Sequence, residues 1–538
     1  MEEFDVVIVG AGPGGIQLAL RLREIAQNTG ADFRFCVLEK ASGPGSFFEH
    51  FPVHGELISN NKLYSGADPR SRFAERFDWN SLITEERAIL TRNYSSDFYP
   101  RREVVGQMLR DLCGRYDLPV RYDTTVTRVA KENDGSFRIE MDGAAMRSRM
   151  VVLATGLKPS RADIPGIELA TPYADMRAAN HYRNQRVLII GKGNSGFECA
   201  KDLLNEAAVI MVASRNPVRL TFQTHYVGNL RHTNALLVEN YHLKHHAAIL
   251  DCEIQGIEKP GDGYQVTVAY AHAHGETETL EFDAVIAATG FTGNLDALDA
   301  GAIGPLLHGK FPEIDGDFGY SDIDGLYFAG ALTHGRDYRS FSSSGFIHGF
   351  RYNSIVLAHH LAERLDVAEE RPCIAGGELL DLLMGEFEED AAIYLQTGYI
   401  GRCFRESGGG NWLDLGHRTR RWFDAAAPGD ATLLFATLEY GNIHAHPDMM
   451  RITRYPGEPD KSVHIHPVVR ARDVCGTREI HLEESLLNRF AHHPTARARL
   501  DQFLHAIGVP HGTRTADELV GAGAAVLPSL DDVKARAG

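Results

Sequence analysis

The sequence of 538 residues has few cysteines, no long apolar run and no excess of positive charge. Its seven cysteines lie far apart, and none forms a Cys-x-x-Cys pair. This spacing argues against a disulfide framework and against a redox-active dithiol. No apolar run reaches the roughly 18 residues that a membrane span needs, and the sequence does not begin with a basic region followed by an apolar stretch. We therefore expect a soluble, cytoplasmic protein.

Acidic residues outnumber basic ones, 72 to 55, which gives a net charge of −17. Such a protein repels nucleic acid and anionic lipid, so neither is expected as a partner, although a local site can still bind an anion. The 43% hydrophobic and 24% charged residues are typical of a globular protein. The length predicts about three domains.

An apolar run at residues 4–9 is followed at once by a glycine-rich loop and then by an apolar helix pattern. This is the context of a dinucleotide-binding fingerprint: Gly10 makes the tight turn, Gly12 admits the pyrophosphate and Gly15 allows helix and strand to pack closely. The next strand, residues 33–38, ends at Glu39, whose carboxylate is expected to accept hydrogen bonds from a ribose hydroxyl. The predicted cofactor-binding residues of this motif are Gly10, Gly12, Pro13, Gly14, Gly15, Glu39 and Lys40.

The same pattern recurs after residues 186–190, but its second strand is followed by Ser214 and Arg215 instead of an acid. A hydroxyl and a guanidinium bind a 2′-phosphate that a carboxylate would repel, so this site is expected to prefer NADPH. The alternative is that Arg215 only solvates a loop. The predicted residues of this second site are Gly191, Gly193, Asn194, Ser195, Ser214 and Arg215.

Two dinucleotide sites in one chain imply that the first holds FAD and the second holds the hydride donor NADPH. Two strands, at residues 151–156 and 284–290, end in Ala-Thr-Gly and fit chain crossings between the two nucleotide domains. A helix expected over residues 347–361 begins after residues 340–346, so its N-terminus can face the carbonyl edge of the flavin. Further predicted cofactor-binding residues are Ala154, Thr155, Gly156, Thr289, Gly290, Gly330 and Phe346.

Together, the two fingerprints, the paired Ala-Thr-Gly strands and Tyr99-Pro100 resemble the flavin-containing monooxygenases. A closer resemblance is to the endoplasmic-reticulum flavoprotein associated with degradation and its bacterial relatives. The usual Trp after the flavin-binding acid is replaced by Phe47-Phe48, and Phe47 is carried over as a cofactor-binding residue. The strings that carry the closer resemblance are Pro44-Gly-Ser-Phe-Phe48, Leu57-Ile-Ser-Asn-Asn-Lys62, Asp78-Trp-Asn-Ser-Leu82, Gly191-Lys-Gly-Asn-Ser-Gly-Phe-Glu198, Thr224-His-Tyr-Val-Gly228 and Gly345-Phe-Ile-His-Gly-Phe-Arg-Tyr352.

The resemblance implies an NADPH-dependent flavoprotein monooxygenase. NADPH would reduce FAD, and a flavin C4a-hydroperoxide would then oxygenate a small molecule, at an amine nitrogen or a sulfur. Two alternatives remain open: a flavin disulfide reductase or oxidase, and a slowly turning-over flavoprotein that binds a protein partner. The disulfide route normally needs a dithiol relay, and no two cysteines are near in sequence.

Three polar residues are candidates for chemistry beside the flavin. The resemblance places an Asn of this region near the flavin, where its amide can hydrogen-bond a distal oxygen; Asn60 and Asn61 are therefore catalytic candidates. Lys62 is a candidate for binding an anionic substrate or polarising the peroxide. Alternatively, Asn60-Asn61 forms a turn and Lys62 is a solvated surface residue.

The expected fold is α/β, with two Rossmann-type domains and a C-terminal extension. Residues 1–165 and 284–365 would form the FAD domain, residues 166–283 the inserted NADPH domain, and residues 370–538 an accessory region whose role as lid, substrate wall or dimer contact is open. Alternating histidines occur at three places, but no carboxylate or cysteine completes a metal-ligand spacing, and no metal is expected. These pairs are His272/His274, His444/His446 and His464/His466.

Overall fold

The computed structural model describes residues 1–224, 226–242, 247–335, 342–427, 429–441, 455 and 457–510. The chain divides into two compact units, unit 1 (Met1–Glu369) and unit 2 (Glu370–Gly538). Among the helices of the described ranges, none combines the length and the apolar character needed to cross a membrane.

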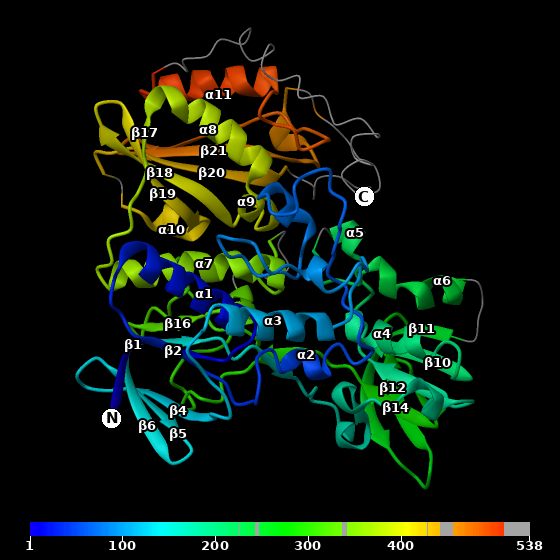
Figure 1. Ribbon diagram of the computed structural model, residues 1–538. Helices are drawn as coiled ribbons and strands as arrows, with labels where there is room; N and C mark the ends of the chain where they lie inside the picture. Colours follow the sequence, from blue (N-terminus) through cyan, green and yellow to red (C-terminus); the bar gives the residue numbers. More distant parts are fainter. Residues whose placement is uncertain are drawn as a thin grey trace, which may run out of the picture. The chain divides into compact units, whose positions relative to one another are not determined.

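The first lobe of unit 1 is built around β1 (Glu2–Val9), in which Val6, Val7 and Ile8 are fully buried (Figure 1). Strands β3, β2, β1 and β6 lie in this order and run parallel, with β16 also parallel to β6; β6, β5 and β4 continue as an antiparallel meander. Burial on both faces explains why β1 is a continuous apolar run. The other strands are β2 (Phe35–Leu38), β3 (Val120–Arg121), β4 (Val126–Lys131), β5 (Phe137–Met141), β6 (Ala144–Leu153) and β16 (Leu326–Phe328).

Helix α1 (Pro13–Thr29) begins directly after the first glycine loop and packs against α7 (Ile347–Arg364). Thirteen residues of α7 are buried, so this helix forms the centre of the lobe and not its surface. The lobe also contains α2 (Phe47–His50) and α3 (Glu103–Arg115).

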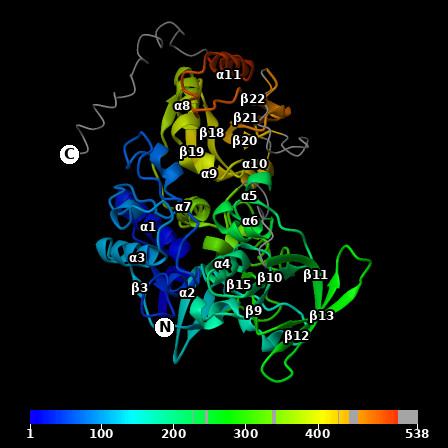
Figure 2. The ribbon, with the colours of Figure 1, turned by 90° about the vertical axis from the view of Figure 1, so that its right-hand side faces the viewer.

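The second lobe repeats this plan, as Figure 2 shows for its strands. Strands β11, β10, β9, β14 and β8 are parallel neighbours, and the long β11 continues into an antiparallel meander with β12 and β13. Its strands are β8 (Thr171–Pro172), β9 (Arg186–Ile190), β10 (Val209–Ser214), β11 (Ala247–Glu258), β12 (Tyr264–Tyr270), β13 (Thr277–Phe282) and β14 (Ala284–Ala287). Its helices are α4 (Asn194–Leu203), α5 (Thr221–Thr224) and α6 (Leu236–His242).

The chain passes between the two lobes through β7 (Leu157–Pro159) and β15 (Phe291–Gly293), which pair with each other in antiparallel fashion. Each of these strands directly follows one of the two Ala-Thr-Gly segments. The two passages therefore form one double connection held by main-chain hydrogen bonds.

Unit 2 contains a six-stranded antiparallel sheet in the order β17-β19-β18-β20-β21-β22. Its main core joins residues of α8 and α11 with strand residues such as Phe404 and Leu434. The strands are β17 (Cys373–Ala375), β18 (Ile400–Gly408), β19 (Asn411–Thr419), β20 (Leu433–Tyr440), β21 (Ile465–Asp473) and β22 (Gly476–His481). The helices are α8 (Gly376–Glu389), α9 (Ala391–Leu395), α10 (Arg420–Ala425) and α11 (Pro494–Ala506).

The predicted α/β fold with two Rossmann-type lobes and a C-terminal extension is confirmed. The role of the extension stays a prediction. His272 and His274 lie in the turn between β12 and β13 and not on a strand. His444 and His446 lie outside the described residues, as do Ser340 and His225 of the segments discussed above.

Candidate cofactor and substrate site

The first glycine loop lies against the backbone that precedes α7. A Cβ on Gly14 would lie 2.3 Å from the Cα of Gly330, so the two chains can approach this closely only without side chains. The Ser354 hydroxyl of α7 donates a hydrogen bond to the Gly14 carbonyl at 3.1 Å. The loop is thus held rigidly at the point where α1 begins.

Gly12 differs from Gly14 because its missing side chain leaves open space. No protein atom lies within 4 Å of a Cβ built on Gly12, and its backbone is extended, with φ −74° and ψ 176°. It is the residue before the first turn of α1, where free N–H groups and the helix dipole favour phosphate. This open cradle fits the pyrophosphate of FAD.

Glu39 is 5% exposed and lies at the end of β2, close to the same loop. Its two carboxylate oxygens accept hydrogen bonds from the backbone N–H groups of Ala11 (2.7 Å) and Ala41 (3.0 Å). Each oxygen has a further lone pair for a ribose hydroxyl. Glu39 therefore orders the loop and remains suited to its predicted role; Lys40 beside it is exposed.

In the second lobe, Gly193 precedes α4 and leaves the same open space as Gly12. The predicted phosphate-binding Ser214 pairs in register with Asp251 of β11, which brings a carboxylate next to the site. The Lys192 ammonium forms an ion pair with Asp251. Burial opposes ionisation of Asp251, but hydrogen bonds from Lys192 and His272 outweigh it and lower the pKa of the carboxyl. Asp251 is therefore ionised, and the ammonium of Lys192 balances its negative charge.

Arg215 is exposed beside Ser214 and forms no ion pair with another described residue. A guanidinium without a protein carboxylate is free to bind the 2′-phosphate of NADPH. This arrangement agrees with the predicted preference for NADPH, which stays a prediction.

The side chain of Asn194 is occupied within its own lobe. Its amide nitrogen donates to the carbonyls of Asn229 (2.9 Å) and Gly228 (3.3 Å), and its oxygen accepts from the backbone N–H of Arg231 (3.0 Å). Asn194 thus fixes the segment that carries Arg231 to the N-terminus of α4. Its neighbour Ser195 lines a cavity.

This cavity, of about 410 Å³, lies between the start of α4 and the second Ala-Thr-Gly segment. Thr289 and Gly290 line it, and the same two residues anchor the crossing: the Thr289 hydroxyl donates to the carbonyl of Ser160 (2.6 Å), and the Gly290 carbonyl accepts from the N–H of Ser160 (2.8 Å). The cavity has room for part of a bound nucleotide. The first crossing is tied in the same way, because Thr155 donates to the Asn294 carbonyl and Gly156 accepts from the Asn294 N–H.

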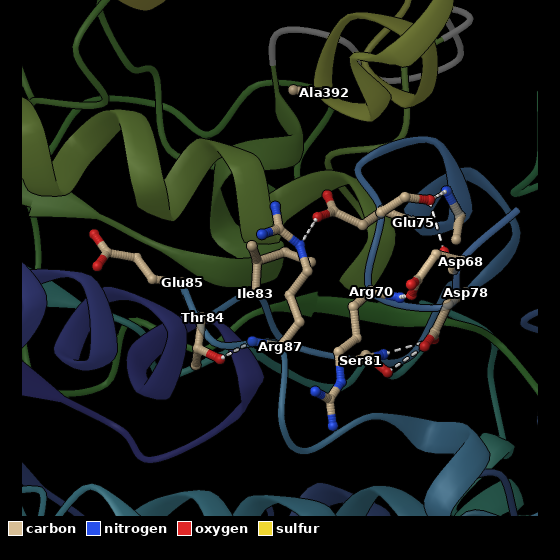
Figure 3. Close-up of polar contacts among 12 residues, drawn as sticks. Asp68, Arg70, Glu75, Asp78, Ser81, Ile83, Thr84, Glu85, Arg87 and Ala392 are labelled. Atoms are coloured by element: carbon tan, nitrogen blue, oxygen red, sulfur yellow. Dashed lines mark hydrogen bonds and ion pairs between the residues drawn. The ribbon is translucent and has the colours of Figure 1, made fainter.

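A loop at residues 73–83 is fastened to α7 by the fully buried Arg351. Its guanidinium donates to the backbone carbonyls of Asp78 (2.8 Å), Ser81 (2.7 Å) and Glu75 (2.9 Å). Within the loop, Asp78 accepts hydrogen bonds from Ser81, and Glu75 forms an ion pair with Arg87, which follows the loop, as Figure 3 shows. These contacts stabilise an irregular segment that has little secondary structure of its own.

The loop places the indole of Trp79 on the imidazole of His348, in the first turn of α7. The ring centroids are 4.0 Å apart and the planes differ by 28°. His348 is 1% exposed, and neither of its ring nitrogens has a hydrogen-bond partner. Burial, together with the charges of Arg351 and Arg231, lowers the pKa of His348 well below its usual value, so the ring is neutral. Phe346, a predicted cofactor-binding residue, precedes α7 and also stacks on the His348 ring, with 5.7 Å between the ring centroids.

The three predicted catalytic residues have different environments. The amide nitrogen of Asn61 donates to the backbone carbonyls of Ser95 (3.0 Å) and Asp97 (3.1 Å), so both of its N–H donors are already bonded to the protein. By contrast, the side-chain oxygen of Asn60 is buried without a hydrogen-bond partner. Lys62 is exposed, with its ammonium 5.2 Å from the ring centre of Phe77. Asn60 is therefore the best placed of the three to meet a bound group.

Aromatic residues near the crossing form one cluster. Phe47 is 38% exposed and lies 4.9 Å from Phe51 and 6.1 Å from Phe291, between ring centroids. Phe51 also stacks on Tyr173, which lines the cavity described above. Phe47 thus joins the cofactor lobe to the second crossing.

Several polar contacts between the lobes were not predicted from the sequence. The Tyr226 hydroxyl and His334 Nε2 are 2.7 Å apart, and Glu198 of α4 lies 3.1 Å from His54. Arg231 reaches the ring of Trp79, 5.5 Å from its centroid. These contacts join residues far apart in the chain, and no local sequence pattern indicates them.

All seven cysteines are free. The four of unit 1 are at most 9% exposed: Cys36, Cys113, Cys199 and Cys252. Burial raises the pKa of each thiol, for Cys36 to about 12. The two exposed cysteines, Cys373 and Cys475, belong to unit 2.

Among known families, residues 7–330 match the pyridine nucleotide-disulphide oxidoreductases. The chain is 32% identical over 391 residues to the FAD-dependent oxidoreductase domain-containing protein 2 of Mus musculus, a match that covers 67% of this chain and 57% of the relative. The protein of the same description from Danio rerio is 28% identical over 449 residues, with 74% and 64% covered. The match thus spans less than two thirds of either relative. These findings confirm the resemblance drawn from the sequence.

Solved structures share the fold. A flavin-containing monooxygenase from Stenotrophomonas maltophilia superposes with a TM-score of 0.50 at 19% identity, over 68% of this chain and 100% of that one. A bacillithiol disulfide reductase from Bacillus cereus gives a TM-score of 0.52, also at 19% identity and with the same coverage. The architecture is therefore common to enzymes of both kinds.

Gly12→Ala is expected to reduce FAD affinity at least tenfold without destabilising the apoprotein, because the new methyl meets no protein atom but occupies the pyrophosphate cradle. Flavin titration of apoprotein measures the affinity, and urea denaturation measures the stability. Gly43→Ala, also at an open position, is the matched control. Unchanged FAD affinity in Gly12→Ala would rule out this position for the pyrophosphate.

Arg215→Ala is expected to weaken NADPH binding about tenfold to hundredfold and to leave NADH binding unchanged, because only NADPH loses a charge-assisted hydrogen bond of about 1.5–3 kcal/mol. Steady-state kinetics of flavin reduction with each nucleotide provides the comparison. The exposed Arg110→Ala is the control for loss of one positive charge. An equal loss for both nucleotides contradicts the assignment.

Proposed function

We propose that this chain, a member of the pyridine nucleotide-disulphide oxidoreductase family, is a monooxygenase. It would transfer one oxygen atom of dioxygen to a small molecule, at an amine nitrogen or a sulfur. It is a flavoprotein oxidoreductase whose cofactors are FAD and NADPH. The overall reaction consumes NADPH, a proton, dioxygen and substrate, and yields NADP⁺, water and the oxygenated product.

The two lobes divide the cofactors in this proposal. Residues 1–165 and 284–365 hold FAD, with its pyrophosphate at Gly12 and its ribose at Glu39, and residues 166–283 hold NADPH, with its 2′-phosphate at Ser214 and Arg215. When bound, FAD would supply the redox chemistry that carries electrons from NADPH to dioxygen. The protein's own part is to align the two cofactors and to exclude water.

The observation that carries the proposal is that the cysteine thiols of unit 1 are buried and have raised pKa values. Reduction of a disulfide through a protein relay needs a reactive thiolate near the flavin. Every cysteine of unit 1 is buried with a raised pKa, so none of them is a suitable nucleophile. Dioxygen needs no such relay.

Water exclusion is supported by the loop at residues 73–83 and the rings packed on α7. Trp79, His348 and Phe346 stack in succession at the start of this helix. In a dry pocket an amide group interacts strongly with a reacting oxygen. Asn60, with its unsatisfied side-chain oxygen, is the residue to which we assign this contact.

The test is NADPH consumption measured together with oxygen uptake, using a panel of amines and thioethers. Monooxygenation predicts oxygen uptake that equals product formed, with little hydrogen peroxide. NADPH oxidation under anaerobic conditions that depends on an added disulfide would instead establish the reductase. Negligible turnover with FAD bound would favour the flavoprotein that binds a protein partner.

Asn60→Ala is expected to retain FAD but to release most of the consumed oxygen as hydrogen peroxide, because the reacting oxygen loses its amide contact. Asn61→Ala is expected to act on stability, by roughly 1–3 kcal/mol, since it leaves two backbone carbonyls without donors. Peroxide yield and urea denaturation distinguish the two effects. Equal coupling in Asn60→Ala and the wild type would remove Asn60 from the reaction.

A further inference from the structure

Three side chains from distant parts of unit 1 meet beside the start of α7. The guanidinium carbon of Arg231 lies 5.5 Å from the ring centre of Trp79, and the same indole stacks on His348 at 4.0 Å. Arg231 comes from the second lobe and the other two from the first. We call these three residues the junction cluster.

Two members of the junction cluster, Arg231 and Trp79, are held in place by separate hydrogen bonds, and the third, His348, lies in the first turn of α7. The backbone of Arg231 is bonded to Asn194 at the N-terminus of α4. The indole N–H of Trp79 donates to the Arg76 carbonyl at 3.0 Å, and Arg351 binds the carbonyl of the preceding residue, Asp78. The site is therefore built before any ligand arrives, which lowers the entropy lost on binding.

Among the described residues, none pairs a carboxylate with the positive charge of the cluster. Arg231 forms no ion pair with any described carboxylate, and its hydrogen-bond partner, Tyr99, is a phenol. The nearby Arg351 is bonded to backbone carbonyls and to the Tyr352 hydroxyl, which itself donates to the Glu75 carboxylate at 2.8 Å. The group without a carboxylate partner is therefore Arg231.

Two polar groups in the cluster thus lack the partners that buried groups normally have. Both ring nitrogens of His348 are buried and unsatisfied, and the partly buried Arg231 forms no ion pair within the part of the chain that the structure describes. Leaving such groups unpaired costs free energy, and native proteins rarely do so without a ligand or a functional reason.

We propose that Arg231, His348 and Trp79 form a binding subsite for an oxyanion, a carboxylate or a phosphate, at the junction of the two lobes. The guanidinium supplies charge and paired donors, and the imidazole supplies one N–H. The indole contacts both groups and holds them side by side. Two sources carry this chemistry: the carboxylate of an acidic substrate and the phosphates of NADPH. The inference goes beyond the proposed reaction, because it holds whether the flavin reduces dioxygen or a disulfide.

The test is calorimetric titration of the FAD-loaded protein with NADP⁺ and, separately, with benzoate as a planar carboxylate probe. Arg231→Gln is expected to weaken at least one of the two about tenfold to hundredfold, as expected for loss of a charge-assisted hydrogen bond. His348→Phe keeps the stack on Trp79 and removes the ring nitrogens, so a smaller loss on the same ligand is expected. The exposed Arg110→Gln is the charge-matched control and should change neither affinity.

The titrations with NADP⁺ and with benzoate show which molecule supplies the oxyanion. A loss confined to benzoate assigns the subsite to a substrate carboxylate, a loss confined to NADP⁺ assigns it to a phosphate, and a loss for both supports a shared oxyanion site. Unchanged affinity for both ligands overturns the proposal.

A second measurement covers the case in which Arg231→Gln fails to fold, as judged by its FAD content. Binding to the wild type should change tryptophan emission, and this change should vanish in Trp79→Phe. Persistence of the full change in Trp79→Phe would overturn the proposal. None of these measurements requires turnover, so a failure of oxygenation leaves them interpretable.

Discussion

The geometry of the site depends on one buried side chain, Arg351. A buried guanidinium costs free energy unless its donors are bonded. Both terminal nitrogens of Arg351 are bonded, to three backbone carbonyls of the loop at residues 73–83 and to the Tyr352 hydroxyl, whereas Nε has no hydrogen-bond partner. The loop cannot leave α7 without exposing this charge to an apolar interior. These hydrogen bonds hold Trp79 in its stacked position over His348.

The parts that could be predicted from the sequence are those in which structure is local. Strands expected at residues 4–9 and 186–190 are observed as Glu2–Val9 and Arg186–Ile190, and the helix expected over residues 347–361 is observed as Ile347–Arg364. In each case a short apolar run or a glycine loop decides the conformation within a few residues. The closely similar plans of the two lobes follow from repeating that local pattern.

The rest of the site could not be predicted because its contacts join residues far apart in the chain. Arg351 binds the carbonyl of Asp78, 273 residues away in the chain, and no periodic pattern in the sequence predicts this contact. The same limit explains Asn60 and Asn61, which are adjacent in sequence but differ in whether their side chains are satisfied. The strings Asp78–Leu82 and Gly345–Tyr352, which carried the family resemblance, prove to be the two sides of one contact.

The contacts between the lobes also bear on hydride transfer, which requires nicotinamide and flavin to be aligned within a few tenths of an ångström. A double crossing alone would act as a hinge. Here Tyr226 is bonded to His334, and Glu198 and Lys201 of α4 lie 3.1 Å and 3.5 Å from His54 and Glu56. These side-chain contacts add to the main-chain pairing of the crossing strands and oppose rotation of one lobe against the other. The alignment of the cofactors is thus determined by the surfaces of both lobes, and the hinge only connects them.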